Sequence, residues 1–100
     1  ELQINVDEII AGDYKLQVLD VLAGNLPLKD KVNGVRQIVA DSNVKDFTEL
    51  YRVLFDKVQE YAPTKVPQSI LTIAEGQYRD SFVVDKEINF VATLYNILNS

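Results

Sequence analysis

The stretch that decides the fold is residues 46–61, DFTELYRVLFDKVQEY. Its apolar residues recur at steps of three and four, which is the spacing of one face of an α-helix. Asp46 and Glu49 have the spacing of a capping box at the start of that helix, with Asp in place of the usual Ser or Thr. The stretch therefore predicts a helix with one buried face. The residues of that face are Phe47, Leu50, Tyr51, Leu54, Phe55, Val58 and Tyr61.

The residues before this stretch predict two further helices. Residues 13–23 carry leucines and valines at helical spacing, and Gly24 follows as a natural C-terminal stop. Pro27 then suits the first turn of the next helix, which ends near residues 41–43. The apolar residues of this second helix are Leu28, Val32, Val35, Ile38 and Val39.

The residues after the stretch predict two more helices. Pro67 opens one of them, and Asp85 is a natural N-cap for the last, which runs to about residue 98. Gly76 lies inside the first of these helices, where it costs about 1 kcal/mol relative to Ala. It is either a point of close approach between two helices or a tolerated surface glycine.

These segments predict an all-α fold, a compact bundle of about five helices formed by residues 13–100. Residues 1–12 are expected to be an irregular lead-in from a missing upstream region. The chain begins at Glu1 rather than Met, which favours a fragment of a longer protein.

The last predicted helix is apolar around most of its circumference. Such a helix is either buried in the centre of a bundle or shared between two partners. We expect the stripe containing Ile88, Val91 and Tyr95 to face the core. The other stripe then becomes the candidate subunit interface, with Arg79 as its polar partner, although a local salt bridge would also suit Arg79. The candidate interface residues are Arg79, Phe90, Leu94 and Ile97.

The composition excludes much catalytic and metal chemistry. The sequence has no Cys and no His, which removes thiolate nucleophiles and the commonest metal ligand and neutral-pH base. No phosphate-cradling glycine motif is present. We therefore expect no catalytic, cofactor-binding or metal site. Ten basic and fifteen acidic residues give a net charge of −5, which disfavours nucleic-acid binding. No apolar run approaches the roughly 20 residues needed to cross a bilayer.

The sequence from Val66 to Leu94 resembles the C-terminal collar domain of clamp-loader small subunits, the replication factor C family and its bacteriophage counterparts. The resemblance lies in Ala74-Glu75 and Gln77-Tyr78-Arg79, in the Val84-Asp85 turn, and in Glu87-Ile88-Asn89 at the start of the last helix. The bacteriophage proteins are the most similar in this pattern.

The resemblance implies an oligomerisation domain for DNA replication. Collars of this family pack in a ring of five subunits and hold the ATPase modules together. The sliding clamp and primer-template DNA would then be bound only through domains outside this chain. The resemblance further implies that the protein is cytoplasmic, in the cytoplasm of the host if a phage encodes it, and that it has no membrane partner. The alternative is a stand-alone helical adaptor that binds a peptide or another protein.

Overall fold

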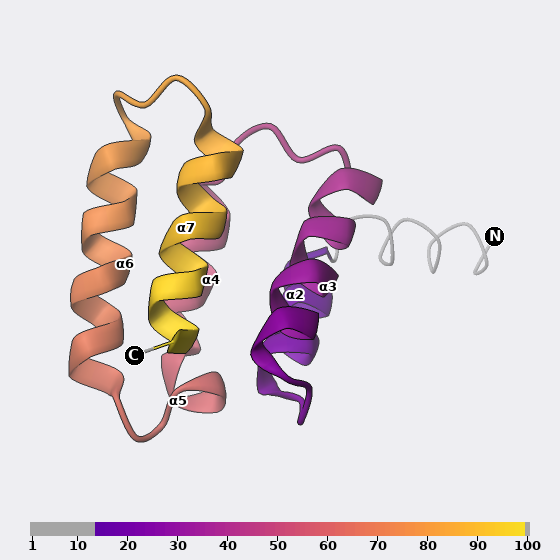
Figure 1. The fold of residues 1–100 in the computed structure, drawn as a ribbon. Helices are drawn as coiled ribbons and strands as arrows, with labels where there is room; N and C mark the ends of the chain where they lie inside the picture. The colour runs from indigo at the N-terminus through magenta and orange to yellow at the C-terminus, as the bar shows by residue number, and fades with distance from the viewer. Residues whose placement is uncertain (1–13, 100) are drawn as a thin grey trace, which may run out of the picture.

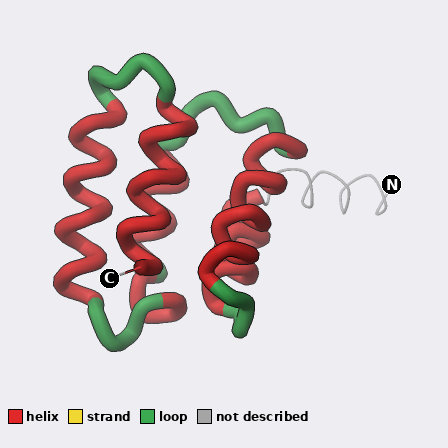
Figure 2. The backbone as a smooth tube through the Cα atoms, in the orientation of Figure 1, coloured by secondary structure: helices red, strands yellow, loops and turns green. Residues whose placement is uncertain are grey.

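The computed structural model describes residues 14–99, and the predicted lead-in over 1–12 lies outside them. The described part of the chain forms six helices and no strand (Figures 1 and 2). The all-α prediction is therefore confirmed. The helices are α2 (Tyr14–Ala23), α3 (Leu28–Asp41), α4 (Thr48–Asp56), α5 (Val58–Tyr61), α6 (Val66–Asp80) and α7 (Lys86–Asn99).

Helices α6 and α7 form a hairpin, and α4 packs behind it (Figure 1). Helix α2 packs on α3 and reaches α4 and α5, while α3 also packs against α7. Helix α7 therefore has α6 on one side and α3 on the other. This position explains why a large part of its surface is apolar.

The core lies between these helices and includes a cluster of aromatic rings. The ring of Phe90 on α7 stacks on Phe47, with ring centroids 5.1 Å apart, and meets Tyr51 edge-on at 5.4 Å. Aromatic pairs in these geometries stabilise a core beyond the area that they bury. The remaining fully buried side chains are aliphatic residues of α2, α3, α4 and α7, together with Ser69 of α6.

The predicted helix starts at Asp85 and Asp46 each have a hydrogen bond from a backbone amide to the Asp side chain. Oδ1 of Asp85 accepts the Ile88 amide at 3.0 Å, and Oδ1 of Asp46 accepts the Thr48 amide at 2.9 Å. This bond lowers the pKa of the Asp46 carboxyl, because it favours the charged form. At the end of α3, Asn43 adopts a φ of 54°, a left-handed conformation that Asn tolerates well.

The predicted single helix over 46–61 is wrong in one detail. It breaks at Lys57, whose φ and ψ of −113° and 21° lie outside the helical region, and the short α5 follows. The break places Val58 and Tyr61 in the core. The Tyr61 hydroxyl donates a 2.6 Å hydrogen bond to the Leu54 carbonyl in the last turn of α4. Carbonyls at a helix end lack intrahelical donors, so this bond satisfies one of them.

Candidate interaction surface

The described residues contain no arrangement suited to metal chemistry. No group of three or more acidic or metal-ligating side chains within residues 14–99 converges on a common point. In the same range, no helix combines the length and the apolar character needed to cross a bilayer.

The two faces of α7 lie opposite to their prediction. Phe90, Leu94 and Ile97 were expected at the interface, but all three are fully buried in the domain core. Ile88 and Tyr95 were expected inside, yet they are 67% and 46% exposed. The reason is that α4, α6 and the Phe47 ring pack against the Phe90 side of α7, which no periodicity within α7 reveals.

An open groove runs between α3 and α7, over the face of α7 that the core leaves uncovered. Its volume is about 610 Å³. Val32 contributes to one wall from α3, and Ile88, Val91, Ala92 and Tyr95 form the other from α7. At its far end the groove continues to Leu28 and Lys29 at the start of α3. We call this feature the α3–α7 groove.

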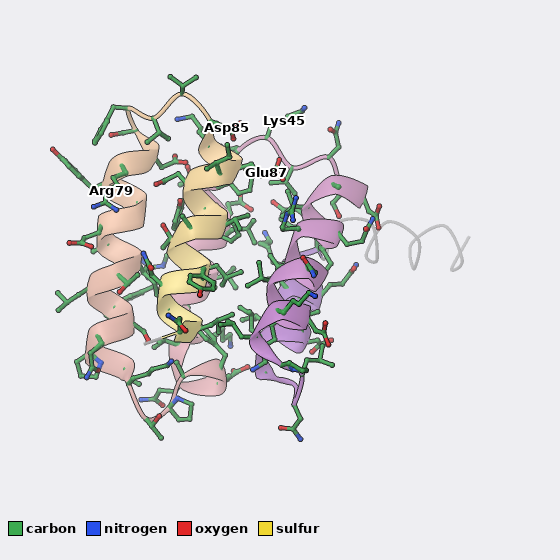
Figure 3. The ribbon with its side chains drawn as sticks, in the orientation of Figure 1. Lys45, Arg79, Asp85 and Glu87 are labelled. Carbon is green, nitrogen blue, oxygen red and sulfur yellow. The ribbon has the colours of Figure 1, made fainter. Side chains whose placement is uncertain are left out.

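Charged side chains line the other end of the α3–α7 groove. Arg36 of α3 lies there together with Asp85 and Glu87 at the start of α7. Figure 3 shows Asp85 and Glu87 at this end of α7. An apolar floor with charges at its rim is the usual composition of a protein–protein contact.

A second apolar surface lies on α6. Ser69, Ile73 and Gly76 are the buried residues of this helix, and the opposite side exposes apolar residues to solvent. Leu71 is 68% exposed and Tyr78 is 72% exposed. The rings of Tyr78 and Phe82 meet edge-on at 5.2 Å, so the exposed aromatics support one another. We call this surface the α6 ridge. Its residues are Leu71, Ala74 and Tyr78 on α6 and Phe82 in the turn that follows the helix.

Arg79 lies beside the α6 ridge, and its side chain is exposed. A local salt bridge was the alternative role for Arg79. Within residues 14–99, no ion pair involves its side chain. In Figure 3, Arg79 lies on α6 and is well separated from Glu87 at the start of α7. The role of Arg79 at a subunit interface stays a prediction.

The close contact between α6 and α7 holds both surfaces in place. A Cβ at Gly76 would lie only 2.4 Å from Oγ1 of Thr93, so glycine is required for this approach. This confirms the first of the two interpretations of Gly76. Nδ2 of Asn89 donates to the Gly76 carbonyl at 2.9 Å and to the Tyr51 hydroxyl at 3.0 Å. Together these contacts tie α4, α6 and α7 to one another.

Sequence reasoning missed the contribution of α3 to the groove. Leu28 and Val32 belong to the apolar stripe predicted for this helix, but only Val35 and Val39 are buried. Leu28 and Val32 are half-buried and line the groove. The sequence signal that could have revealed this is the length of the apolar stripe of α3, which is greater than the core of so small a domain requires.

None of the protein-family models, curated proteins or solved structures that were compared with the chain matches it. The function must therefore be argued from the surfaces described above and from the residues that carry the resemblance.

Proposed function

We propose that this domain joins protein subunits, as the collar of a DNA-replication sliding-clamp loader, and performs no catalysis itself. The observation that carries the proposal is the α3–α7 groove. It exposes Ile88 and Tyr95 on α7 beside the half-buried Val32 of α3, around an open volume of about 610 Å³. Contiguous apolar surface of this kind on a small domain typically marks a contact with another protein.

The distribution of side chains in the groove supports an interface over a site for a small substrate. Tyr95 and Ile88 protrude from α7 and supply the kind of apolar anchor that carries most of the energy of an interface. The ionisable groups at the rim are Arg36, Asp85 and Glu87.

The clamp-loader part of the proposal rests on the resemblance over residues 66–94. The resembling residues lie on both surfaces: Gln77-Tyr78-Arg79 belongs to α6 beside the ridge, and Glu87-Ile88-Asn89 opens α7 beside the groove. Partners would be further clamp-loader subunits, in a pentamer by resemblance. The clamp and DNA would be bound by other domains.

A variant that fills the groove tests the proposal. In the full-length parent protein, Ala92→Arg should release neighbouring subunits, because a long charged side chain would occupy the groove. Ala23→Arg is the matched control, since Ala23 is an exposed alanine at the end of α2 and outside the groove. Native mass spectrometry of the assembly gives the measurement. Assembly of Ala92→Arg that equals assembly of Ala23→Arg would contradict the proposal.

The groove also suits an adaptor that binds an amphipathic helix of another protein, and the parent sequence separates the two functions. A Walker phosphate-binding motif encoded upstream of Glu1 is expected for a clamp loader. A parent without such a motif would overturn the clamp-loader assignment and leave the adaptor.

A further inference from the structure

We propose that the N-terminal segment, residues 1–13, docks as a strap in a second groove, which lies between α4 and α6 of the same chain. This α4–α6 groove has a volume of about 250 Å³. It shares no lining residue with the α3–α7 groove. The inference therefore does not rest on the proposed function.

The α4–α6 groove contains apolar side chains that the described part of the chain leaves partly uncovered. Phe55 belongs to the apolar stripe predicted over 46–61, yet it is 42% exposed, whereas the other residues of that stripe are buried. Ile70 of α6 lines the same groove and is half-buried. An apolar segment laid in the groove would remove both side chains from water, which is favourable.

The charge of the groove complements that of the segment. Among the described residues that line the groove, only Arg52 is charged. Its guanidinium carbon lies 5.3 Å from the centroid of the Phe55 ring, and its Nε donates to Asp56 at 3.2 Å. The other N–H groups of a guanidinium can bind a further carboxylate. Residues 1–13 contain no Lys or Arg, and their acidic residues are Glu1, Asp7, Glu8 and Asp13.

The start of α2 lies next to a row of side chains that leads to the groove. Nζ of Lys15 is 2.7 Å from Oε1 of Glu49 in the first turn of α4. Glu49, Arg52 and Phe55 follow one another at steps of three, so they lie along one side of that helix. A segment that leaves α2 in this direction reaches Arg52 first and the apolar part of the groove next.

The order of residues in the segment fits this path. Counted backwards from Tyr14, the acidic pair Glu8 and Asp7 comes first, and alternating apolar residues follow. The stretch between Tyr14 and Glu8 can extend to roughly 20 Å, which exceeds the roughly 10–12 Å diameter of a helix. Alternating residues of an extended segment point to one side, so all of these apolar side chains can enter the groove together. They are Val6, Ile4 and Leu2.

The α3–α7 groove is less suited to an acidic segment. Its charged end carries the carboxylates of Asp85 and Glu87 as well as the cation of Arg36. Like charges that are brought together oppose binding. The α4–α6 groove is therefore the site that we assign to the strap.

Disulfide trapping in the full chain tests the strap, because the sequence has no Cys of its own. Ile4→Cys is combined with Gln77→Cys in the α4–α6 groove or, as the matched control, with Ala92→Cys in the α3–α7 groove. Gln77 and Ala92 are both exposed, so the fold should be retained, as circular dichroism can verify. In a glutathione redox buffer, the Ile4–Gln77 pair should close at least roughly tenfold faster than the control pair, because a disulfide needs its two Cα atoms within about 7 Å. Mass spectrometry measures the closure.

A charge reversal gives a second measurement on the same pair. Arg52→Glu should slow closure of the Ile4–Gln77 pair at least roughly tenfold, since repulsion replaces attraction. Adding Asp7→Lys and Glu8→Lys should restore the rate. Arg36→Glu alters the charged end of the other groove and should leave the rate unchanged.

Three results would overturn the strap: equal closure of the two pairs, faster closure of the Ile4–Ala92 pair, or a disulfide that joins two chains instead of residues of one. Closure that is insensitive to Arg52→Glu would equally contradict it. None of these results bears on the proposed function, which Ala92→Arg tests through assembly.

Discussion

At the scale of single residues, Gly76 and its neighbours decide how closely α6 and α7 approach. The Thr93 side chain occupies the space where a Cβ at position 76 would lie, and the Thr93 hydroxyl itself donates to the Asn89 carbonyl at 2.9 Å. Replacing a surface glycine in a helix by Ala would increase stability, but Gly76 is enclosed by the Thr93 side chain.

We therefore expect Gly76→Ala to destabilise the domain. The new methyl group would force the helices apart, and overpacking of this kind typically costs about 1–3 kcal/mol. A solvent-exposed glycine in a helix would instead gain about 1 kcal/mol from the same change. Urea denaturation distinguishes the two signs. In a double-mutant cycle, Thr93→Ala should reduce the cost of Gly76→Ala, and strict additivity would contradict the contact.

A second prediction at this scale concerns Tyr51. Burial, followed by the nearby Asp80 charge, raises the pKa of Tyr51 to about 12. A tyrosine in the unfolded chain ionises near pH 10. The unfolded state therefore loses its proton first, and the free energy of unfolding should fall as pH rises from about 10 towards 12.

The Tyr51→Phe variant isolates this contribution, because it removes the titrating hydroxyl and keeps the ring. Its unfolding free energy should fall less over that pH range than that of the unmodified chain. The measurement is urea denaturation at a series of pH values. Tyr78→Phe is the control, since the Tyr78 side chain is 72% exposed. Equal slopes for Tyr51→Phe and the unmodified chain would contradict the assignment.

At the scale of the helices, α7 is the element whose role the structure changes. It carries two apolar stripes, and the stripe with Phe90, Leu94 and Ile97 is in the core. The other stripe, with Ile88 and Tyr95, lines the α3–α7 groove. The groove stripe is thus the face available to partners.

This reversal makes a prediction for two alanine variants of α7. Phe90→Ala should destabilise the isolated domain by about 3–5 kcal/mol, because it leaves a cavity beside Phe47 and Tyr51. Tyr95→Ala should change stability far less, since its ring is 46% exposed. Thermal unfolding followed by circular dichroism gives the comparison. Similar losses in both variants would mean that Tyr95 also belongs to the core.

At the scale of the whole molecule, the charge balance limits the partners. The net charge is −5, and the ten basic residues are distributed among fifteen acidic ones. A protein that binds duplex DNA neutralises phosphates with clustered Lys and Arg. The partners that we propose are therefore proteins rather than duplex DNA.

We accordingly expect no measurable affinity of the isolated domain for duplex DNA at physiological salt. Fluorescence anisotropy with a labelled duplex, titrated to high micromolar protein, checks this, with a basic DNA-binding domain as the positive control. Micromolar binding that weakens steeply with added salt would show phosphate contacts and contradict the expectation.

The sequence by itself determined the helices, because their periodicity and caps are local properties. The Asp85 cap and the Asn43 stop each act within a few residues, and both are found as expected. Most of the apolar stripe of 46–61 is buried as predicted, but Phe55 is 42% exposed. The break at Lys57 was not predicted either, since it depends on Val58 and Tyr61 reaching the core.

The tertiary structure alone decided which apolar surfaces are buried. Both stripes of α7 are apolar, so nothing within that helix distinguishes them. The choice is made by distant residues, chiefly Phe47, Tyr51 and Gly76, which pack against the Phe90 side. Once that side is filled, Ile88 and Tyr95 remain at the surface beside Leu28 and Val32 of α3. Which side chains are buried depends on how the helices pack against one another, and the α3–α7 groove is formed only by that packing.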